Sequence, residues 1–172
     1  MITFLVNNYN TFSQKTYDKF LDKIQFHQLS CPCGNIGNLK IHGYYRRSIK
    51  THEGKITLNI CRVKCPYCSK THALLPSFIV PYSQISLTDH IDIITASSPD
   101  ELQTVMNANL LIDESNCSYI RRQFKKLWQQ RLLSYGISII KFIPLIKDCF
   151  KAFSRQFMQI KGTSNILFSK TT

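Results

Sequence analysis

The stretch that decides the fold is residues 31–68, CPCGNIGNLKIHGYYRRSIKTHEGKITLNICRVKCPYC. It opens with a Cys-Pro-Cys-Gly sequence and closes with a Cys-Pro-Tyr-Cys sequence. Four thiolates at the corners of a tetrahedron, with Zn–S bonds of about 2.3 Å, form a closed structural zinc site. The sequence therefore predicts a zinc ribbon in which one Zn²⁺ is bound by Cys31, Cys33, Cys65 and Cys68.

The spacing of the two cysteine pairs leaves the choice of ligands open. The second pair has ordinary CxxC spacing, whereas the first is a shortened CxC. Cys61, His42 and His72 are the possible substitutes for one of the four cysteines. Unrelated buried thiols or a disulfide are the alternative to a metal site, but two Pro-flanked pairs favour metal ligation.

Between the pairs the sequence has the pattern of a β-hairpin. Ile56, Leu58 and Ile60 alternate with other residues at the period of a half-buried strand, and Glu53-Gly54 lies where the chain must reverse. A unit this small has too little core to fold alone. Zinc binding would therefore supply on the order of 10 kcal/mol of its folding free energy.

Length and composition indicate a folded protein outside the membrane. The chain has 172 residues, of which 44% are hydrophobic, enough for one ordinary domain or two small ones. Neither a signal peptide nor an apolar run of about 18 to 20 residues is visible in the sequence. We expect the reducing cytoplasm, where paired cysteines more often hold metal than form disulfides.

The net charge of +12 is concentrated in two blocks. Residues 31–75 carry eight Lys or Arg against Glu53 alone, and residues 114–161 carry ten against two acids. Such blocks can neutralise phosphates and release counterions, which favours a nucleic acid partner over an uninvolved solvated surface. The side chains expected to contact nucleic acid are Lys40, Arg46, Arg47, Lys50, Arg62, Lys64, Arg121, Arg122, Lys125, Lys126 and Gln129.

Outside the ribbon the sequence predicts helices. Ser13 is expected to cap an amphipathic helix, and the capping sequences at Ser86 and Ser98 predict further helices. A third, longer helix, capped by Asp113 or Ser115, would complete a helix-turn-helix unit. The expected divisions are an N-terminal amphipathic helix over 1–30, the zinc ribbon over 31–80, the helix-turn-helix over 86–135, and C-terminal helices and tail over 136–172. The predicted helices cover about 87–96, 99–107 and 114–134.

The fold class predicted is α+β, a small β-hairpin zinc ribbon followed by an α-helical helix-turn-helix bundle. On the third helix an apolar stripe faces away from basic and amide side chains. Arg suits guanine edges, Gln suits adenine and Lys suits phosphate, so this helix is the expected reader of the DNA major groove. A bundle helix with a solvated cationic face is the alternative.

No enzyme is expected from the motifs present. GxxxxGK[ST], GxGxxG, HExxH and GxSxG are all missing from the sequence. The ten acidic residues show no clustering suited to two metal ions. The apolar stretch that follows Gly136 is expected to pack on the helical unit or to form a homodimer.

Several short segments resemble a known group of proteins. Cys31-Pro-Cys33-Gly34, Ile41-His-Gly-Tyr-Tyr-Arg46 and Thr71-His-Ala-Leu-Leu-Pro76 are similar to the N-terminal zinc-ribbon segment of insertion-sequence transposases. They are closer to an uncharacterised bacterial family of small zinc-ribbon proteins found around mobile elements. The resemblance implies a bacterial origin and a DNA-related role without catalysis.

The function expected is that of a DNA-binding protein with a structural zinc ion, acting as a mobile-element accessory factor or transcriptional regulator. It would be cytoplasmic and associated with the nucleoid, with double-stranded DNA as its expected partner and a recombinase or transposase as a second one. Two alternatives remain open: a zinc-ribbon protein that binds structured RNA, and a non-catalytic adaptor that recruits a recombinase. The DNA site and the oligomeric state are left open by the sequence.

Overall fold

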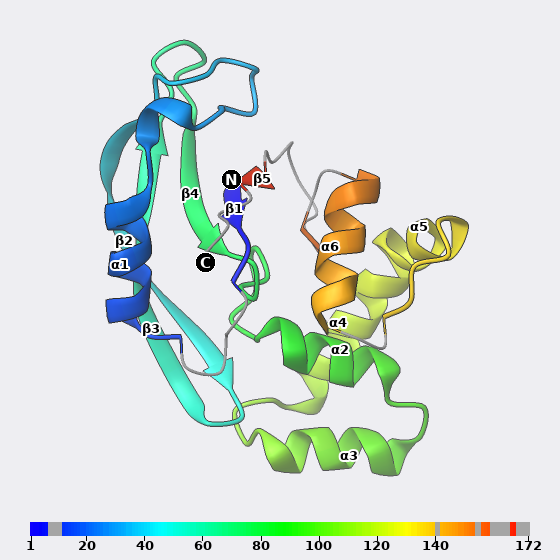
Figure 1. Cartoon of the computed structure of the whole chain (residues 1–172). Helices are drawn as coiled ribbons and strands as arrows, with labels where there is room; N and C mark the ends of the chain where they lie inside the picture. Colours follow the sequence, from blue (N-terminus) through cyan, green and yellow to red (C-terminus); the bar gives the residue numbers. More distant parts are fainter. Residues whose placement is uncertain (7–11, 140–141, 154–155, 159–165, 168–172) are drawn as a thin grey trace. The chain divides into compact units, whose positions relative to one another are not determined.

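The computed structural model describes residues 1–6, 12–139, 142–153, 156–158 and 166–167 (Figure 1). The chain divides into two units. Unit 1 comprises Met1–Ser48, Thr57–Ser77 and Lys161–Thr172, and unit 2 comprises Ile49–Ile56 and Phe78–Ile160. Both strands and helices occur, so the α+β class is confirmed.

A five-stranded sheet of order β2-β3-β4-β1-β5 contains the predicted hairpin (Figure 1). Its strands in this order are β2 (Lys40–Thr51), β3 (Gly54–Lys64), β4 (Thr71–Pro76), β1 (Ile2–Phe4) and β5 (Ile166–Leu167). β3 and β4 are antiparallel, with Val63 opposite His72. The sheet is therefore larger than the small hairpin that the sequence predicted.

The reversal between β2 and β3 lies where the sequence placed it. His52 and Glu53 form the turn, and Gly54 follows with φ +117°, a conformation that costs little without a Cβ. Along β3, Leu58 and Ile60 are buried and Thr57 and Asn59 are exposed, but Ile56 is only half-buried and Cys61 is buried beside Ile60. The predicted alternation of a half-buried strand is therefore confirmed over residues 57–60.

The N-terminal strand β1 was not predicted. It lies between β4 and β5 and is parallel to both, with Ile2 opposite Leu74. Ile2, Thr3 and Phe4 are all buried, so no alternation marks this strand in the sequence. The first residues of the chain thus belong to the sheet, and a helix follows them in the sequence.

Helix α1 (Gln14–Lys23) begins after Ser13, whose side chain accepts a hydrogen bond from the Thr16 N–H, as predicted for the cap. A 3₁₀ turn, η1 (Phe26–Gln28), follows the helix. The pairing of β3 with β4 starts only at Arg62. Before that point α1 supplies partners for two N–H groups of β3, one on the exposed Asn59 and one on the buried Cys61.

The partners on α1 are Gln14 and Tyr17. Gln14 Oε1 accepts from the Asn59 N–H at 2.7 Å, and Tyr17 Oη accepts from the Cys61 N–H at 2.9 Å. The same Tyr17 hydroxyl donates to the Leu74 carbonyl at 2.9 Å, so one buried side chain joins β3 to β4.

Unit 2 contains five helices among the described residues. These are α2 (Leu87–Thr95), α3 (Pro99–Ala108), α4 (Glu114–Leu127), α5 (Gln129–Ser134) and α6 (Phe142–Phe153). Ser86, Ser98 and Asp113 cap the first three through their side chains, which confirms these predicted starts. α2, α3 and α4 share a core of Ile85, Ile93, Ile112, Cys117 and Ile120, packed against Ile94, Leu102, Val105 and Met106.

The single helix predicted over 114–134 is wrong, because the chain breaks at Trp128. That residue has φ −123° and separates α4 from α5. Its buried indole ring packs edge-on against Phe153 and Phe157, with ring centroids 5.9 and 5.5 Å apart. The break therefore lies at the residue whose ring contacts α6, through Phe153, and the turn after α6, through Phe157.

α6 contains Pro144 near its start, as expected from the sequence. The helix was predicted to continue to about Gln159, but it ends at Phe153, and residues 157–158 form a turn. Residues 154, 155 and 159 lie outside the described residues. In the part of the chain that the structure describes, no helix has the length and apolarity needed to span a membrane.

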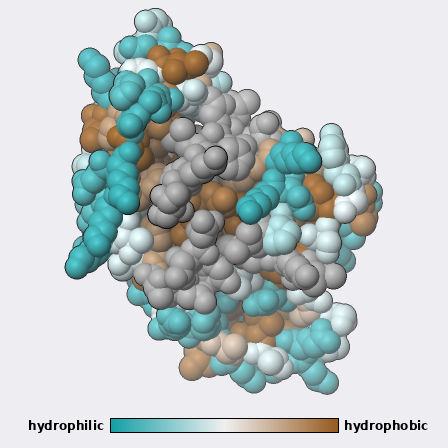
Figure 2. All heavy atoms as spheres, in the orientation of Figure 1, coloured by the Kyte–Doolittle hydropathy of each residue, from teal (hydrophilic) through white to brown (hydrophobic). Residues whose placement is uncertain are grey.

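Hydrophobic atoms on the face drawn in Figure 2 occur in separate patches between hydrophilic side chains. The large exposed apolar residues include Ile36, Tyr67, Tyr82 and Leu110. Isolated apolar side chains of this kind are normal on protein surfaces and indicate no site by themselves.

Candidate metal centre and cationic surfaces

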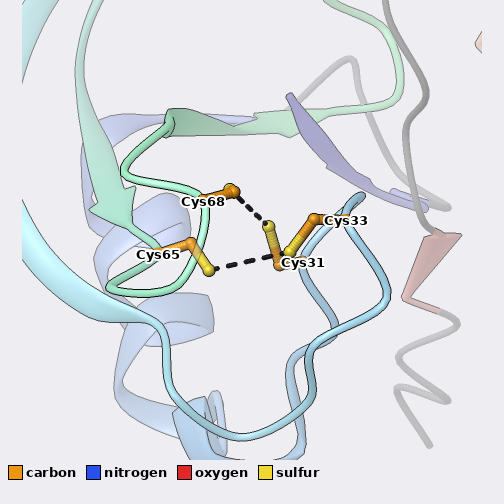
Figure 3. A group of neighbouring side chains, drawn as sticks. All are labelled: Cys31, Cys33, Cys65 and Cys68. Carbon is orange, nitrogen blue, oxygen red and sulfur yellow. Dashed lines mark hydrogen bonds between the residues drawn. The ribbon is translucent and has the colours of Figure 1, made fainter.

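The four cysteines named from the sequence converge in unit 1 (Figure 3). Their Sγ atoms all lie within 4.8 Å of one another. The Cys31–Cys68 Sγ distance is 3.6 Å and the Cys33–Cys65 distance is 3.8 Å. A tetrahedron with metal–sulfur bonds of about 2.3 Å has edges of about 3.8 Å, so this cluster could hold a metal ion and is compatible with zinc.

The first pair is held by a tight turn in the backbone. The Gly34 N–H donates to the Cys31 carbonyl at 2.9 Å, and the Cys31 N–H donates to the Asn35 carbonyl at 2.7 Å. Gly34 has φ +94°, a conformation that other residues rarely adopt. This turn brings the Cys33 thiol back beside Cys31 despite the shortened CxC spacing.

The second pair lies in the connection between β3 and β4. The Cys65 N–H donates to the Lys70 carbonyl at 3.0 Å and closes the loop. Backbone N–H groups of Cys68 and Tyr67 point at the Cys65 sulfur and lower the pKa of that thiol to about 7. These donors favour the thiolate form, which is the form that binds metal.

The thiols differ in their exposure to solvent. Cys31 and Cys65 are buried, Cys68 is half-buried and Cys33 is exposed. Burial raises the pKa of Cys31 to about 12, because a thiolate is poorly solvated there. A divalent cation among the four sulfurs would provide the missing stabilisation of this negative charge.

The possible substitute ligands lie outside the set of four. Within the described residues, the group whose ligand atoms are mutually within 4.8 Å does not include Cys61, His42 or His72. His72 is nevertheless adjacent, because its Nε2 lies 3.4 Å from the Cys31 sulfur. Burial lowers the pKa of His72 to about 4, so the neutral ring can donate an N–H to that sulfur as an outer partner.

The cationic candidates on the hairpin have different surroundings. Lys40, Arg46, Arg62 and Lys64 are exposed, and Arg47 is half-buried. The ammonium group of Lys50, in contrast, is bonded inside unit 2. It donates to the Leu111 carbonyl at 2.7 Å and to Asn116 Oδ1 at 3.4 Å.

On α4 the structure brings most of the remaining candidates together. An open pocket of about 610 Å³ is lined by Ser118, Arg121, Arg122, Lys125 and Lys126. Ser118 was not predicted, although its position one turn before Arg122 places it on the same helix face. Gln129 is half-buried and belongs to α5, beyond the break at Trp128.

Fold and cluster together define the class: an α+β protein with a four-cysteine centre able to hold a metal ion. A family described as a domain of unknown function (DUF6431) matches residues 31–118, just over half of the 172 residues, and the chain belongs to this family. The match starts at Cys31 and contains all four cysteines. No curated protein and no solved structure matches the chain.

Proposed function

We propose that the protein binds double-stranded DNA and that a structural zinc ion holds its four-cysteine centre. The observation that carries the proposal is the convergence of four cysteine sulfurs within 4.8 Å in a chain of net charge +12. When bound, zinc would stabilise the fold and leave no open position for catalysis, since all four ligands come from the protein. The role proposed is therefore that of a non-catalytic zinc-ribbon protein.

The charge on α4 supports a phosphate-bearing partner. Arg122, Lys125 and Lys126 are exposed and line one pocket. Among the residues that the structure describes, no acidic side chain forms an ion pair with any of these three. Each is thus available to neutralise a DNA phosphate and release counterions.

The arrangement of α2, α3 and α4 supports the helix-turn-helix reading. Three capped helices share one core, and the last carries the cationic pocket on its outer side. In that reading α4 would enter the major groove, and its exposed cations would contact phosphates that border the groove. Exposed cations of the hairpin, such as Arg46 and Arg62, are proposed separately as backbone contacts.

The biological setting is proposed from the resemblance of the cysteine segments to those of mobile-element proteins. A factor of this kind would act beside a recombinase or transposase, or regulate transcription, in the nucleoid of a bacterial cytoplasm. The homodimer expected from the C-terminal apolar stretch belongs to the same proposal.

The test is an unbiased selection of bound nucleic acid by the full chain purified with its metal. We expect duplex DNA to be enriched, and the logarithm of its affinity to fall steeply with the logarithm of salt concentration, by about 0.9 per phosphate contacted. An affinity that does not change with salt concentration would instead indicate a protein adaptor. Cleavage or joining of DNA with Mg²⁺ would contradict the non-catalytic assignment.

Structured RNA is the second candidate, and exposed tyrosines favour it. Tyr44 and Tyr67 are 50% and 68% exposed and lie near cations of the hairpin and the second cysteine pair in sequence. Unpaired RNA bases stack on such rings. Competition between duplex DNA and structured RNA at equal salt separates the two, because the preferred class displaces the other.

A further inference from the structure

Arg121 is bonded to the end of another helix. Its Nε donates to the Ile93 carbonyl at 2.9 Å, and its terminal nitrogen donates to the Ala96 carbonyl. These carbonyls lie at the C-terminal end of α2, where backbone oxygens lack partners within the helix. The C-terminal end of a helix also carries partial negative charge, so a cation there stabilises it.

Lys50 bonds two oxygen atoms near the start of α4. Its side chain reaches the Leu111 carbonyl, in the connection before α4, and the Asn116 side chain in the first turn of α4. Its backbone is fixed as well, since the Lys50 N–H donates to the Gln84 carbonyl at 2.6 Å and the Ser86 N–H donates to the Lys50 carbonyl at 3.2 Å.

The other side chains of the α4 pocket are exposed, including Arg122, whose guanidinium lies 5.9 Å from the ring centroid of Tyr119. Ser118, Arg122, Lys125 and Lys126 are all exposed, and their spacing places them along one side of α4. Hydroxyl, guanidinium and ammonium groups are the donors that bind the phosphodiester backbone. The pocket is open to solvent, so it suits a passing strand rather than an enclosed small molecule.

We infer that Lys50 and Arg121 are positioning residues that fix α4 within unit 2, and that Ser118, Arg122, Lys125 and Lys126 contact the DNA backbone. The inference rests on the proposed DNA-binding function and divides the cationic residues into two groups. Apart from the neutral Ser118, the residues of both groups are positively charged. The two groups differ in their bonding partners and in exposure, since Lys50 and Arg121 are half-buried.

Two matched pairs of variants test the division: Arg121→Gln against Arg122→Gln, and Lys50→Met against Lys55→Met. Lys55 is an exposed lysine on the same hairpin. Each full-length variant is measured for its Tm and for duplex affinity across a series of salt concentrations. Arg121→Gln and Lys50→Met are expected to lower Tm by about 4 °C or more while the salt slope stays unchanged.

Arg122→Gln is expected to keep the wild-type Tm, weaken binding by about fivefold or more, and reduce the salt slope by about 1. Lys55→Met should keep the wild-type Tm. Arg121→Lys retains the charge but not the two directed bonds, so it should lower Tm like Arg121→Gln.

The division is overturned if Arg121→Gln keeps its Tm and reduces the salt slope as Arg122→Gln does. It is also overturned if Arg121→Lys is indistinguishable from the wild type, since charge alone would then suffice. Absence of duplex binding by the wild-type protein would reject the proposed function and, with it, the contact assignment. These results differ, so failure of the division can be told from failure of the function.

Discussion

At the scale of the residue, the four cysteines of the centre differ from the remaining cysteines by their neighbours. Cys65 has three sulfurs within 4.8 Å, whereas Cys61 is buried in the same unit outside the cluster. Cys65→Ser would remove one thiolate ligand and leave the other three sulfurs close together with an incomplete set of metal ligands. Cys61→Ala removes a buried thiol that lies outside the cluster, and this variant serves as the control.

We predict that Cys65→Ser loses bound zinc and that unit 1 unfolds, since structural zinc contributes on the order of 10 kcal/mol to small metal-dependent folds. Cys61→Ala should keep the zinc and lose only about 1 kcal/mol of stability. Zinc content and circular dichroism measure both effects. Equal zinc content in the two variants would contradict the assignment of Cys65.

We predict that His90 in α2 makes the stability of unit 2 sensitive to pH. Burial lowers the pKa of His90 to about 4, against about 6.5 in an unfolded chain, and its Nδ1 lies 2.9 Å from the Ser86 carbonyl. The unfolded state therefore binds the additional proton as pH falls from 6.5 to 4. The free energy of unfolding that His90 contributes above pH 6.5 is therefore lost as the pH falls from 6.5 to 4.

The expected loss between pH 7 and pH 5 is about 2 kcal/mol more in the wild type than in His90→Gln. Burial raises the pKa values of Asp89 and Asp92, which have the opposite pH dependence, but both proteins contain these residues. Urea unfolding at the two pH values gives the difference. Parallel pH dependences would mean that His90 is not the group that titrates.

The cysteine centre could be predicted from the sequence because two pairs flanked by Pro are a distinctive pattern. The roles of Lys50 and Arg121 could not, because a charged residue in a basic block has the same appearance whether it meets a phosphate or a carbonyl. His72 could be named as a candidate, but its place beside Cys31 depends on the pairing of β3 with β4.

At the scale of the element, α1 completes the hydrogen bonding of β3 where β4 does not reach. Tyr17 is fully buried and its hydroxyl bonds both the Cys61 N–H and the Leu74 carbonyl. Tyr17→Phe would leave two buried backbone groups without this partner. The cost of such unpaired groups is about 1 to 3 kcal/mol.

We therefore predict that Tyr17→Phe destabilises the protein by about 1 to 3 kcal/mol in urea unfolding. Tyr67→Phe is the control, since that hydroxyl is on an exposed ring and its loss should change stability by less than about 0.5 kcal/mol. If Tyr17→Phe changes the free energy of unfolding as little as Tyr67→Phe does, the bridge between β3 and β4 is not energetically important.

Helix starts were predictable because caps are local: Ser86 and Ser98 each bond an N–H three residues later. The strands β1 and β5 were not, because a two- or three-residue strand has no readable period. Their pairing joins segments about 70 residues or more apart in sequence, as Ile2 and Leu74 show. The end of α4 depends on the burial of Trp128 against aromatic residues that follow much later.

At the scale of the whole molecule, the metal centre joins parts of the chain that are distant in sequence. The two cysteine pairs are separated by the entire β2–β3 hairpin, and the second lies directly before β4. A shared ion would thus restrain the hairpin, β4 and the segment before β2 together. The matched family region, residues 31–118, contains this centre and extends into α4.

Mass spectrometry of the intact chain tests the central claim most directly, because the native spectrum reports bound metal and the spectrum after acid denaturation reports the state of the thiols. We predict one zinc ion per chain, and after acid denaturation the mass of a protein with all seven cysteines reduced. A metal-free chain lighter by the hydrogens lost in one or two disulfides would contradict the account.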